Sequence, residues 1–505
     1  MNIRSKNMFS VGLSVVLTLA TVGTVLAAAF TGPSSSQSPY ILPSQPDVDI
    51  QSVLTVGDSV NTKPDGVTPY RMVGIPDGVG VFDNEGGGAG RGEDEDKQEG
   101  LEDTFTVLMN HELPNTSGIV RAHGAPGAFI SKWIISKEDL SVISGEDLIQ
   151  NVMMWDAISG QYVPATVAQK SFTRFCSGDL PAKSAFYDSR SKLGYKGRIY
   201  MNGEESGAEG RAFAHLLTGT SYELPALGKF AWENSVANPK TGKKTVVAGT
   251  DDGTGGQVYF YVGEKTKSSN PVEAAGLTNG VLFGIKVAGM DVETNSTVLS
   301  GPVAFTAYNF GNVSSWTGAQ LESASKDANG AYRVTTFQRP EDGAWDPEHP
   351  NDFYFVTTAS FTGNSRLWRA HFKNPAKPEL GGTIEMLLDG TEGQKMMDNL
   401  TINEHGQLVI QEDPGNQTYI ARIWLYDIKH DTLTEIAAHD PNRFAPGAVN
   451  FLTQDEESSG VVDASEILGD GTYLLVQQAH YKTDTELVEG GQLLVMRVGS
   501  EHEDK

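Results

Sequence analysis

The chain has 505 residues and a formal net charge of -26, with a sequence pI near 4.7. A protein that follows a nucleic-acid backbone needs a basic face, so this acid excess argues against nucleic acid as a partner. The chain has one cysteine, which excludes an internal disulfide, so the fold must be held by its core, with bound ions as a further means.

The N-terminal segment, residues 1–29, has the pattern of a secretory signal peptide. Arg4 and Lys6 precede an apolar stretch at 11–26, and small residues follow at 27–29. An N-terminal membrane anchor is the alternative, because the stretch approaches the length that spans a bilayer. We expect export with cleavage, to the periplasm or the cell exterior, and no membrane span in the mature chain.

The remaining sequence is rich in short strand-like segments. They alternate in polarity or are short apolar runs, and Gly, Asp, Asn and Pro bound them. Six of them lie at residues 104–110, 197–203, 244–250, 351–358, 406–413 and 472–478. Glycine is abundant, at 56 residues, while helical periodicity is scarce. This pattern is typical of a sandwich, a barrel or a propeller.

A repeat of roughly fifty to sixty residues favours the propeller. In its compact copies an acidic residue opens one strand, a turn follows, a second strand ends on a polar pair, and a third strand follows a polar loop. The sequence therefore predicts an all-β fold, a six-bladed β-propeller with inserted loops and few short helices. We expect residues 30–60 to form a flexible tail and residues 61–500 to form the single propeller domain.

Acidic residues recur at both ends of this repeat. The strand openers are Asp77, Asp179, Glu233, Glu341 with Asp342, Asp398 and Asp463. The second strands end on His111-Glu112, Glu204-Glu205, Asp251-Asp252, Thr357-Thr358, Glu412-Asp413 and Gln477-Gln478. In a propeller, equivalent ends of the innermost strands converge on one axis. Carboxylates that converge cannot all remain ionised without cations, so the pattern predicts a hard-metal site such as one for calcium.

Three other residues are candidates for this site. Cys176 is either a buried inert thiol or a metal thiolate, and its place three residues before Asp179 favours the thiolate. Arg339 is either a surface ion-pair partner or a fork for phosphate. His111 is either a satisfied structural histidine or a group that supports the metal ligands.

Several motifs, taken in order, resemble the PhoX-type alkaline phosphatases. They are Asn-His-Glu at 110–112, Cys-Ser-Gly at 176–178 before Gly-Glu-Glu at 203–205, Arg-Pro-Glu at 339–341, and Asp-Asn-Leu at 398–400 before Gly-Gln-Leu at 406–408. The resemblance extends from about Met72 to Gln478. Two features depart from the family pattern: the chain has a general secretory signal rather than a twin-arginine one, and SGDLPAKSAFYD stands where the family has Thr-Pro-Trp-Gly-Thr-Trp.

The resemblance implies a propeller with a buried iron and calcium cluster that hydrolyses phosphate monoesters. By motif, Cys176 would bind iron and Arg339 would contact the phosphate. The carboxylates that the resemblance and the repeat together assign to metal are Glu112, Glu204, Glu205, Asp252, Glu341, Asp398 and Asp413.

The sequence thus predicts a secreted, monomeric, metal-dependent phosphatase that acts on a small phosphorylated substrate with calcium and iron as cofactors. One alternative is a non-catalytic propeller that calcium stabilises and that binds a ligand at the cell surface. Another is a propeller hydrolase of different specificity, such as a phytase or a lactonase.

Overall fold

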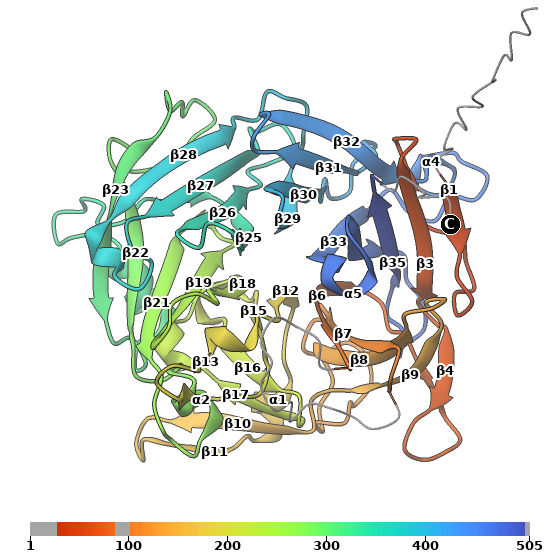
Figure 1. Cartoon of the computed structure of the whole chain (residues 1–505), viewed down its shortest axis with the longest axis horizontal. Helices are drawn as coiled ribbons and strands as arrows, with labels where there is room; N and C mark the ends of the chain where they lie inside the picture. The colour runs from red at the N-terminus through yellow and green to blue at the C-terminus, as the bar shows by residue number, and fades with distance from the viewer. Residues whose placement is uncertain (1–27, 86–100, 500–505) are drawn as a thin grey trace, which may run out of the picture.

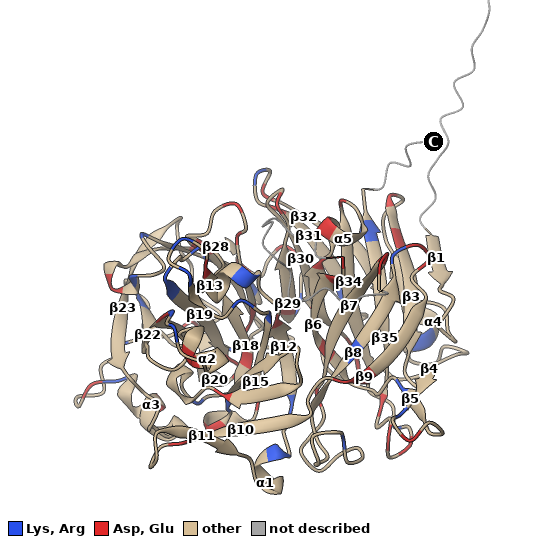
Figure 2. Ribbon diagram, turned by 60° about the horizontal axis from the view of Figure 1, so that its bottom comes forward, with Lys and Arg blue, Asp and Glu red and all other residues tan. Residues whose placement is uncertain are grey.

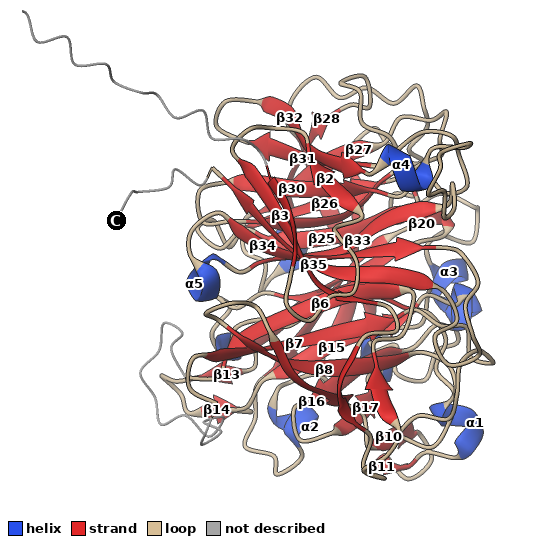
Figure 3. Cartoon of the chain, turned by 90° about the vertical axis from the view of Figure 1, so that its right-hand side faces the viewer, coloured by secondary structure: helices blue, strands red, loops and turns tan. Residues whose placement is uncertain are grey.

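A computed structural model of the chain describes residues 28–85 and 101–499. It consists of mainly antiparallel sheets set around a central axis, with one strand of each sheet nearest the centre (Figure 1). Figure 3 shows that strands dominate and that the helices are short and lie at the periphery. The prediction of an all-β propeller with few helices is confirmed. The predicted signal peptide falls almost entirely in residues 1–27, outside the described residues.

The sheets follow one another along the chain. The first sheet contains β6 (Pro76–Asp83), β7 (Thr104–His111), β8 (Phe129–Ser136) and β9 (Val142–Asp147). The second contains β12 (Phe175–Asp179), β15 (Ile199–Glu204), β16 (Ala212–Leu216) and β17 (Thr220–Glu223), extended by β10 (Asn151–Asp156) and β11 (Gln161–Pro164). The third contains β18 (Trp232–Ala237), β19 (Lys244–Asp251), β21 (Val258–Glu264) and β22 (Val281–Val287).

The fourth sheet is joined to the third through one shared outer strand. That strand is β23 (Val303–Gly311), and the fourth sheet contains β25 (Pro340–Trp345), β26 (Asp352–Thr357), β27 (Arg366–Phe372) and β28 (Gly382–Leu388). The fifth contains β29 (Met397–Ile402), β30 (Gln407–Glu412), β31 (Arg422–Asp427), β32 (Thr432–His439) and β2 (Ile41–Pro43). The sixth contains β33 (Glu456–Asp463), β34 (Thr472–Ala479), β35 (Gly490–Val498), β3 (Val48–Thr55) and β1 (Ala28–Thr31). Among the strands of these sheets, β1 with β3 and β10 with β17 are the parallel pairs.

Minor elements lie in the connections. Three ribbons of two strands are formed by β4 (Ser59–Thr62) with β5 (Pro69–Arg71), β13 (Tyr187–Asp188) with β14 (Leu193–Gly194), and β20 (Thr254–Gly256) with β24 (Phe337–Gln338). The helices are α1 (Val167–Lys170), α2 (Pro271–Ala274), α3 (Gly318–Ala324), α4 (Pro441–Phe444) and α5 (Ser465–Leu468). Short 3-10 turns occur at Lys183–Ala185, Gly207–Glu209, Pro225–Leu227 and Pro378–Leu380.

The innermost strands make a closed circuit. Each of β6, β12, β18, β25, β29 and β33 contacts the next, and β33 contacts β6. This circuit supports the predicted count of six blades, which stays a prediction. It also brings the starts of strands that are far apart in sequence to one place.

The core lies between neighbouring sheets, and it explains why the second strand of each sheet is apolar on both faces. Val107 of β7 packs towards the sixth sheet in a cluster with Val476. Its neighbour Leu108 packs towards the second sheet in a cluster with Phe213. Side chains alternate across a strand, and a strand buried on both faces therefore reads as a continuous apolar run.

The predicted flexible tail at residues 30–60 is wrong for much of its length. The segment Val48–Thr55 forms β3, which pairs antiparallel with β35 at Val48↔Val498 through Thr55↔Gln492. Ile50 and Leu54 are fully buried in this strand. This strand is ordered because it is buried on both faces and pairs with the C-terminal strand. The Pro- and Ser-rich residues before it, 31–46, resemble a linker.

Acidic and basic residues are mixed along the chain. Figure 2 shows Lys and Arg positions interspersed with Asp and Glu positions on the ribbon. Among residues 28–85 and 101–499, no helix has the length and apolarity that crossing a bilayer requires.

Candidate metal and phosphate site

In each of the six sheets, the first residue of the inner strand pairs with the last residue of the strand beside it. The paired residues are Pro76↔His111, Phe175↔Glu204, Trp232↔Asp251, Pro340↔Thr357, Met397↔Glu412 and Glu456↔Ala479. In the first five sheets an irregularity in the register begins directly after this pair. A bulge re-aims the side chains that follow it, and here it falls at the same place in each of those sheets.

The residue after the first paired position defines what we call the strand-start ring. Its members are Asp77, Cys176, Glu233, Glu341, Asp398 and Glu457. Every one is at most 9% exposed. Five carboxylates and one thiol therefore occupy equivalent positions around the axis.

A second set of equivalent residues follows the neighbouring strand. The backbone N–H of each donates to the carbonyl of the residue two positions before the strand-start member of the same sheet, at 2.9–3.0 Å. This strand-end ring consists of Glu112, Glu205, Asp252, Thr358, Asp413 and His480. Four of its six members are acidic. The two rings together place nine carboxylates and one thiol around the axis.

Burial makes this concentration of acid costly in the absence of cations. The pKa of Asp77 is raised well above its usual range by burial and then by the charges of Glu112 and Glu457. Burial raises the pKa of Glu233 to about 8 and that of Asp413 to about 7. Burial and the neighbouring Asp77 likewise raise the pKa of the Cys176 thiol. Cations would remove this cost by stabilising the charged forms.

Glu457 is held in its charged form by His480, a residue of the protein itself. Burial opposes ionisation, but hydrogen bonding from His480 and its positive charge lower the pKa of Glu457. The pKa of His480 is raised to about 11, where hydrogen bonds and charges of Glu457 and Glu489 outweigh burial. The sixth sheet thus supplies an acid and a histidine to the rings, whereas the first, third and fifth sheets each supply two acids.

The donor set fits metal ions. Three groups have ligand atoms within 4.8 Å of one another: Asp77 with Glu112 and Cys176, Cys176 with Glu205 and Glu233, and Glu233 with Glu341 and Asp398. Asp77 Oδ1 is buried and has no hydrogen-bond partner among the described residues. A buried carboxylate oxygen without a donor is costly, and a cation would satisfy it. The chain of three groups shares Cys176 and Glu233, so neighbouring ions would share ligands.

The bulged start of β12, which carries the thiol, is fixed by hydrogen bonds from other sheets. Asn110 Nδ2 donates to the Cys176 carbonyl at 2.7 Å, and Cys176 Sγ lies 3.3 Å from Asp77 Oδ2. Ser177 Oγ donates to Glu233 Oε1 at 2.6 Å and accepts from Asn399 Nδ2 at 2.6 Å. First, second, third and fifth sheets therefore meet at this strand start.

Two arginines occupy equivalent positions directly before β12 and β25. Arg174 and Arg339 have left-handed backbones, with φ of 46° and 59°. Ile75 and Met396, directly before β6 and β29, have the same conformation, with φ of 49° and 41°, so this backbone is a shared feature of the strand starts. The two guanidinium groups consequently flank the rings from the second and fourth sheets.

Each arginine bridges two ring carboxylates. Arg174 Nε donates to Glu112 Oε1 at 2.7 Å, and its other end pairs with Glu205. Arg339 makes a fork on Asp252, at 2.7 and 2.8 Å, and contacts Glu341 Oε1 at 2.9 Å. Their side chains keep 47% and 33% of their surface exposed, so both can also meet a ligand from solvent.

The structure places most of the predicted site residues in the rings. These are Cys176, Glu112, Glu205, Asp252, Glu341, Asp398 and Asp413, with Arg339 at the edge. Glu204 differs: its two oxygens accept a fork from Arg211 at 2.5 and 2.6 Å, outside both rings. It is the last residue of β15, and the side chain after it faces the opposite way.

Two of the predicted strand openers lie elsewhere. Asp179 accepts a hydrogen bond from the Ala237 N–H at 2.8 Å, three residues past the ring member of its sheet. Asp463 lies at the far end of β33 and bonds to the backbone of Ser465 at 3.0 Å. His111 is fully buried and bonds to Ser131 Oγ at 2.8 Å. It has a structural role in the first sheet.

Sequence reasoning missed four residues at this site. They are Arg174, Glu457, Gln478 and His480. Gln478 was noted only as an uncharged strand end, yet its Nε2 lies 3.2 Å from both Asp77 Oδ2 and Glu112 Oε2. For Glu457 the available signal was its position one residue into the inner strand, which is the position of Asp77 in the first sheet.

Comparisons with known proteins agree with this architecture. A family model described as alkaline phosphatase PhoX matches residues 215–394. This stretch includes Glu233, Asp252, Arg339 and Glu341. Pseudomonas fluorescens PhoX, solved in complex with vanadate, a transition state analogue, has 10% identity to the chain and a TM-score of 0.62. The match covers 90% of this chain and 95% of that one.

More distant likenesses are weaker. A 6-phosphogluconolactonase, described as putative, from Bacteroides uniformis has 12% identity and a TM-score of 0.31, with 65% of this chain and 80% of that chain covered. A comparison with curated proteins gives no match. The predicted resemblance to the PhoX-type alkaline phosphatases is confirmed by the family model, and the similar structure shows the fold.

Proposed function

We propose that this chain, which is similar to the alkaline phosphatase PhoX family, is an exported metal-dependent phosphatase that hydrolyses small phosphate monoesters. The observation that carries the proposal is the pair of rings: carboxylates and one thiol at equivalent strand positions, flanked by two arginines. A purely structural calcium site has no need for guanidinium groups at its rim. The family match over residues 215–394 supports the same reaction.

Calcium and iron are the cofactors that this donor set favours. Calcium takes six to eight oxygen ligands, which carboxylates from several strands supply. A thiolate favours a softer metal, and Cys176 with Glu205 and Glu233 therefore forms the candidate iron position. Bound there, the ions would supply neutralisation of phosphate charge and activation of a nucleophilic oxygen.

The chain's own residues would bind and orient the phosphate. Arg339 uses Nε and Nη2 of its guanidinium fork on Asp252 and Glu341, so Nη1 would donate to a phosphate oxygen, and a third of the side chain faces solvent. Asp252 and Glu341 hold this fork in place before substrate arrives. Charge spread over the phosphate oxygens in the transition state is stabilised mainly by such prepositioned positive groups.

Arg174 would act from the second sheet, two sheets away from Arg339 in the circuit of inner strands. It occupies the equivalent backbone position in the second sheet and is more exposed than Arg339. Its bridge between Glu112 and Glu205 would keep the first and second sheets together at the rim. A monomeric protein would suffice for this arrangement, since all the groups come from one chain.

Metal analysis and turnover, measured on the same purified protein, test the proposal. We expect calcium and iron in the protein as isolated, and hydrolysis of a chromogenic phosphomonoester that falls after chelation and returns with calcium. Calcium without iron and without turnover would leave the chain a non-catalytic propeller. Turnover of a lactone in place of the ester would assign it another hydrolase activity.

A further inference from the structure

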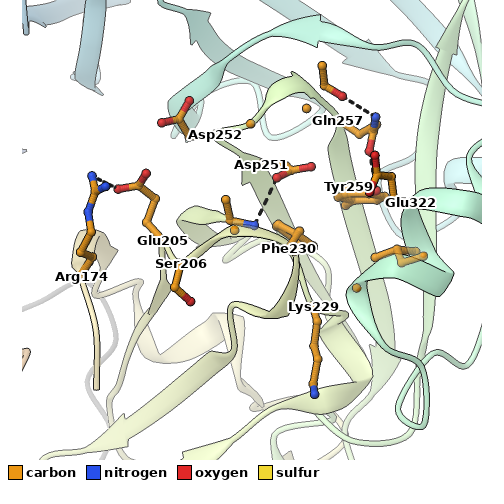
Figure 4. Close-up of a pocket in the computed structure, with 18 of the residues that line it drawn as sticks. Arg174, Glu205, Ser206, Lys229, Phe230, Asp251, Asp252, Gln257, Tyr259 and Glu322 are labelled. Atoms are coloured by element: carbon orange, nitrogen blue, oxygen red, sulfur yellow. Dashed lines mark hydrogen bonds and ion pairs between the residues drawn. The ribbon is translucent and has the colours of Figure 1, made fainter. Parts of the chain in front are cut away.

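A cavity of about 450 Å³ lies beside the rings, between the second and third sheets (Figure 4). Its lining includes Arg174, Glu205 and Asp252, which belong to the site described above. The rest of its wall comes from Thr173, Asp251, Tyr259, residues 206–208, 229–231, 253 and 255–257, and from α3. The volume falls in the range of small-molecule sites. A ligand held at the rings would therefore find a partly open cavity on this side.

The wall of the cavity is rigid. Phe230 is 3% exposed and stacks on Trp232 with ring centroids 3.9 Å apart. Tyr259 packs on Phe230 at 4.7 Å, and its hydroxyl donates to Gln257 at 2.8 Å. On the other side, α3 approaches so closely that a Cβ on Gly318 would lie 1.4 Å from the Ala208 carbonyl oxygen. The cavity is thus built by fixed packing rather than by a loose loop.

The lining combines an aromatic floor with an excess of negative charge. With ions bound at the rings, Glu205 and Asp252 are neutralised, and Asp251 and Glu322 remain as acids of the lining; of its cations, Lys229 is paired with Glu209 at 3.3 Å. Arg174 is already bridged to two carboxylates. Figure 4 shows Asp251, Tyr259 and Glu322 grouped around one side of the hollow. Such a lining suits hydroxyl groups and apolar faces and disfavours a further anion.

We propose that this cavity is the subsite for the organic part of the substrate, and that it selects monoesters whose leaving group is neutral or cationic, such as a hydroxylated sugar or polyol. This proposal rests on the proposed phosphatase activity. Phosphate at the rings and an alcohol in the cavity would be bound at adjoining places that share Asp252 and Arg174. Esters that carry a second phosphate or a carboxylate would meet the acidic lining.

Filling the cavity tests its role as a subsite. Ser206 is exposed at its wall, and Ser206→Trp would occupy the space. We expect the ratio of kcat/KM for glucose 6-phosphate to that for methyl phosphate to fall at least tenfold, because only the hexose reaches the cavity. Ser269→Trp, an exposed serine away from the lining, is the matched control and should leave the ratio unchanged.

Charge selection is tested with two esters that differ in one group. Glycerol 3-phosphate and 3-phosphoglycerate differ by a hydroxymethyl and a carboxylate. We expect the wild type to prefer the first at least tenfold, and Glu322→Lys to reduce this preference at least threefold. Glu379→Lys, at an exposed position outside the lining, should keep it.

The outcomes separate the subsite from the activity. If the wild type hydrolyses neither methyl phosphate nor the larger esters, the proposed phosphatase function and its subsite both fail. If methyl phosphate and glucose 6-phosphate are hydrolysed and Ser206→Trp affects both equally, only the subsite is overturned. Equal turnover of the two glycerol-type esters would overturn the charge selection.

Discussion

Replacing Arg339 by alanine should lower the melting temperature mainly in the metal-free protein, and should lower kcat/KM in the metal-loaded protein. Its guanidinium makes two hydrogen bonds to Asp252 and one contact with Glu341, all between 2.7 and 2.9 Å. Charge-assisted hydrogen bonds contribute about 1.5–3 kcal/mol each when buried. With a third of the side chain exposed, solvent screening reduces this to roughly 1 kcal/mol each, or about 3 kcal/mol in total.

This loss converts into a shift in melting temperature. Unfolding entropy near 2.1 cal/mol/K per residue gives about 1 kcal/mol/K for a domain of roughly 450 residues. The metal-free Arg339→Ala protein should therefore melt about 3 °C below the metal-free wild type. With calcium bound, cations neutralise Asp252 and Glu341, so the difference in melting temperature should shrink to about 1 °C.

Catalysis should show the reverse. A prepositioned donor to developing charge contributes about 100- to 1,000-fold to kcat, so kcat/KM of the metal-loaded variant should fall by at least ~100-fold. Scanning fluorimetry with and without chelator, together with phosphomonoester kinetics, measures both effects. Arg339→Lys is the control, because it keeps the charge and loses the fork. An unchanged kcat/KM, with the same loss of stability in both metal states, would reduce Arg339 to a structural ion pair.

Three further predictions follow from the rings. Cys176→Ser should lose most of its iron, measured by elemental analysis, while calcium is retained; unchanged iron would return the thiol to an inert role. Glu205→Gln should lose metal and activity, whereas Glu204→Gln should keep both. Glu204→Gln should instead lose about 2–3 kcal/mol of stability, because it breaks the buried ion pair with Arg211. Equal metal loss in the two variants would contradict the assignment of Glu205 to the metal site. The chelated protein should become more stable as the pH is lowered from about 8. Burial raises the pKa of Glu233 to about 8 in the folded state, so at pH 6 to 8 the folded protein binds a proton at Glu233 that the unfolded chain does not bind. Calcium should weaken this trend, and a melting temperature that falls from pH 8 to 6 in chelator would refute it.

Much of the architecture was predictable because each repeat has the same physical signature. The second strand of every sheet is apolar on both faces, and acids begin the inner strands. The exact ring members were harder to predict. Glu204 and Glu205 are adjacent, and a shift of one residue exchanges the faces of a strand. Their choice depends on a register that begins at the left-handed Arg174, which no composition signal marks.

The sixth sheet shows the same limit in another way. Its opener was placed at Asp463, whereas the structure uses Glu457, six residues earlier. Here the bulge lies between Ser459 and Val461 rather than directly after the first pair. The N-terminal strand β3 was missed because its partner β35 lies over 400 residues away in sequence. Such distant pairing leaves no local pattern.

The pairing of β3 with β35 joins the two ends of the chain and closes the ring of sheets, and the metal site can form only after this closure. Gln478 of the last sheet donates to Asp77 and Glu112 of the first, and also to Glu457 of its own sheet. These contacts form only after both ends of the chain have met, which is a slow and entropically costly event. A chain whose sixth sheet is still in the ribosome or in a translocation pore would hold nine of the ten carboxylate and thiol groups of the rings, but no finished site. Ion uptake would then be the last step of maturation, and the bound ions would stabilise the contacts between the first and last sheets.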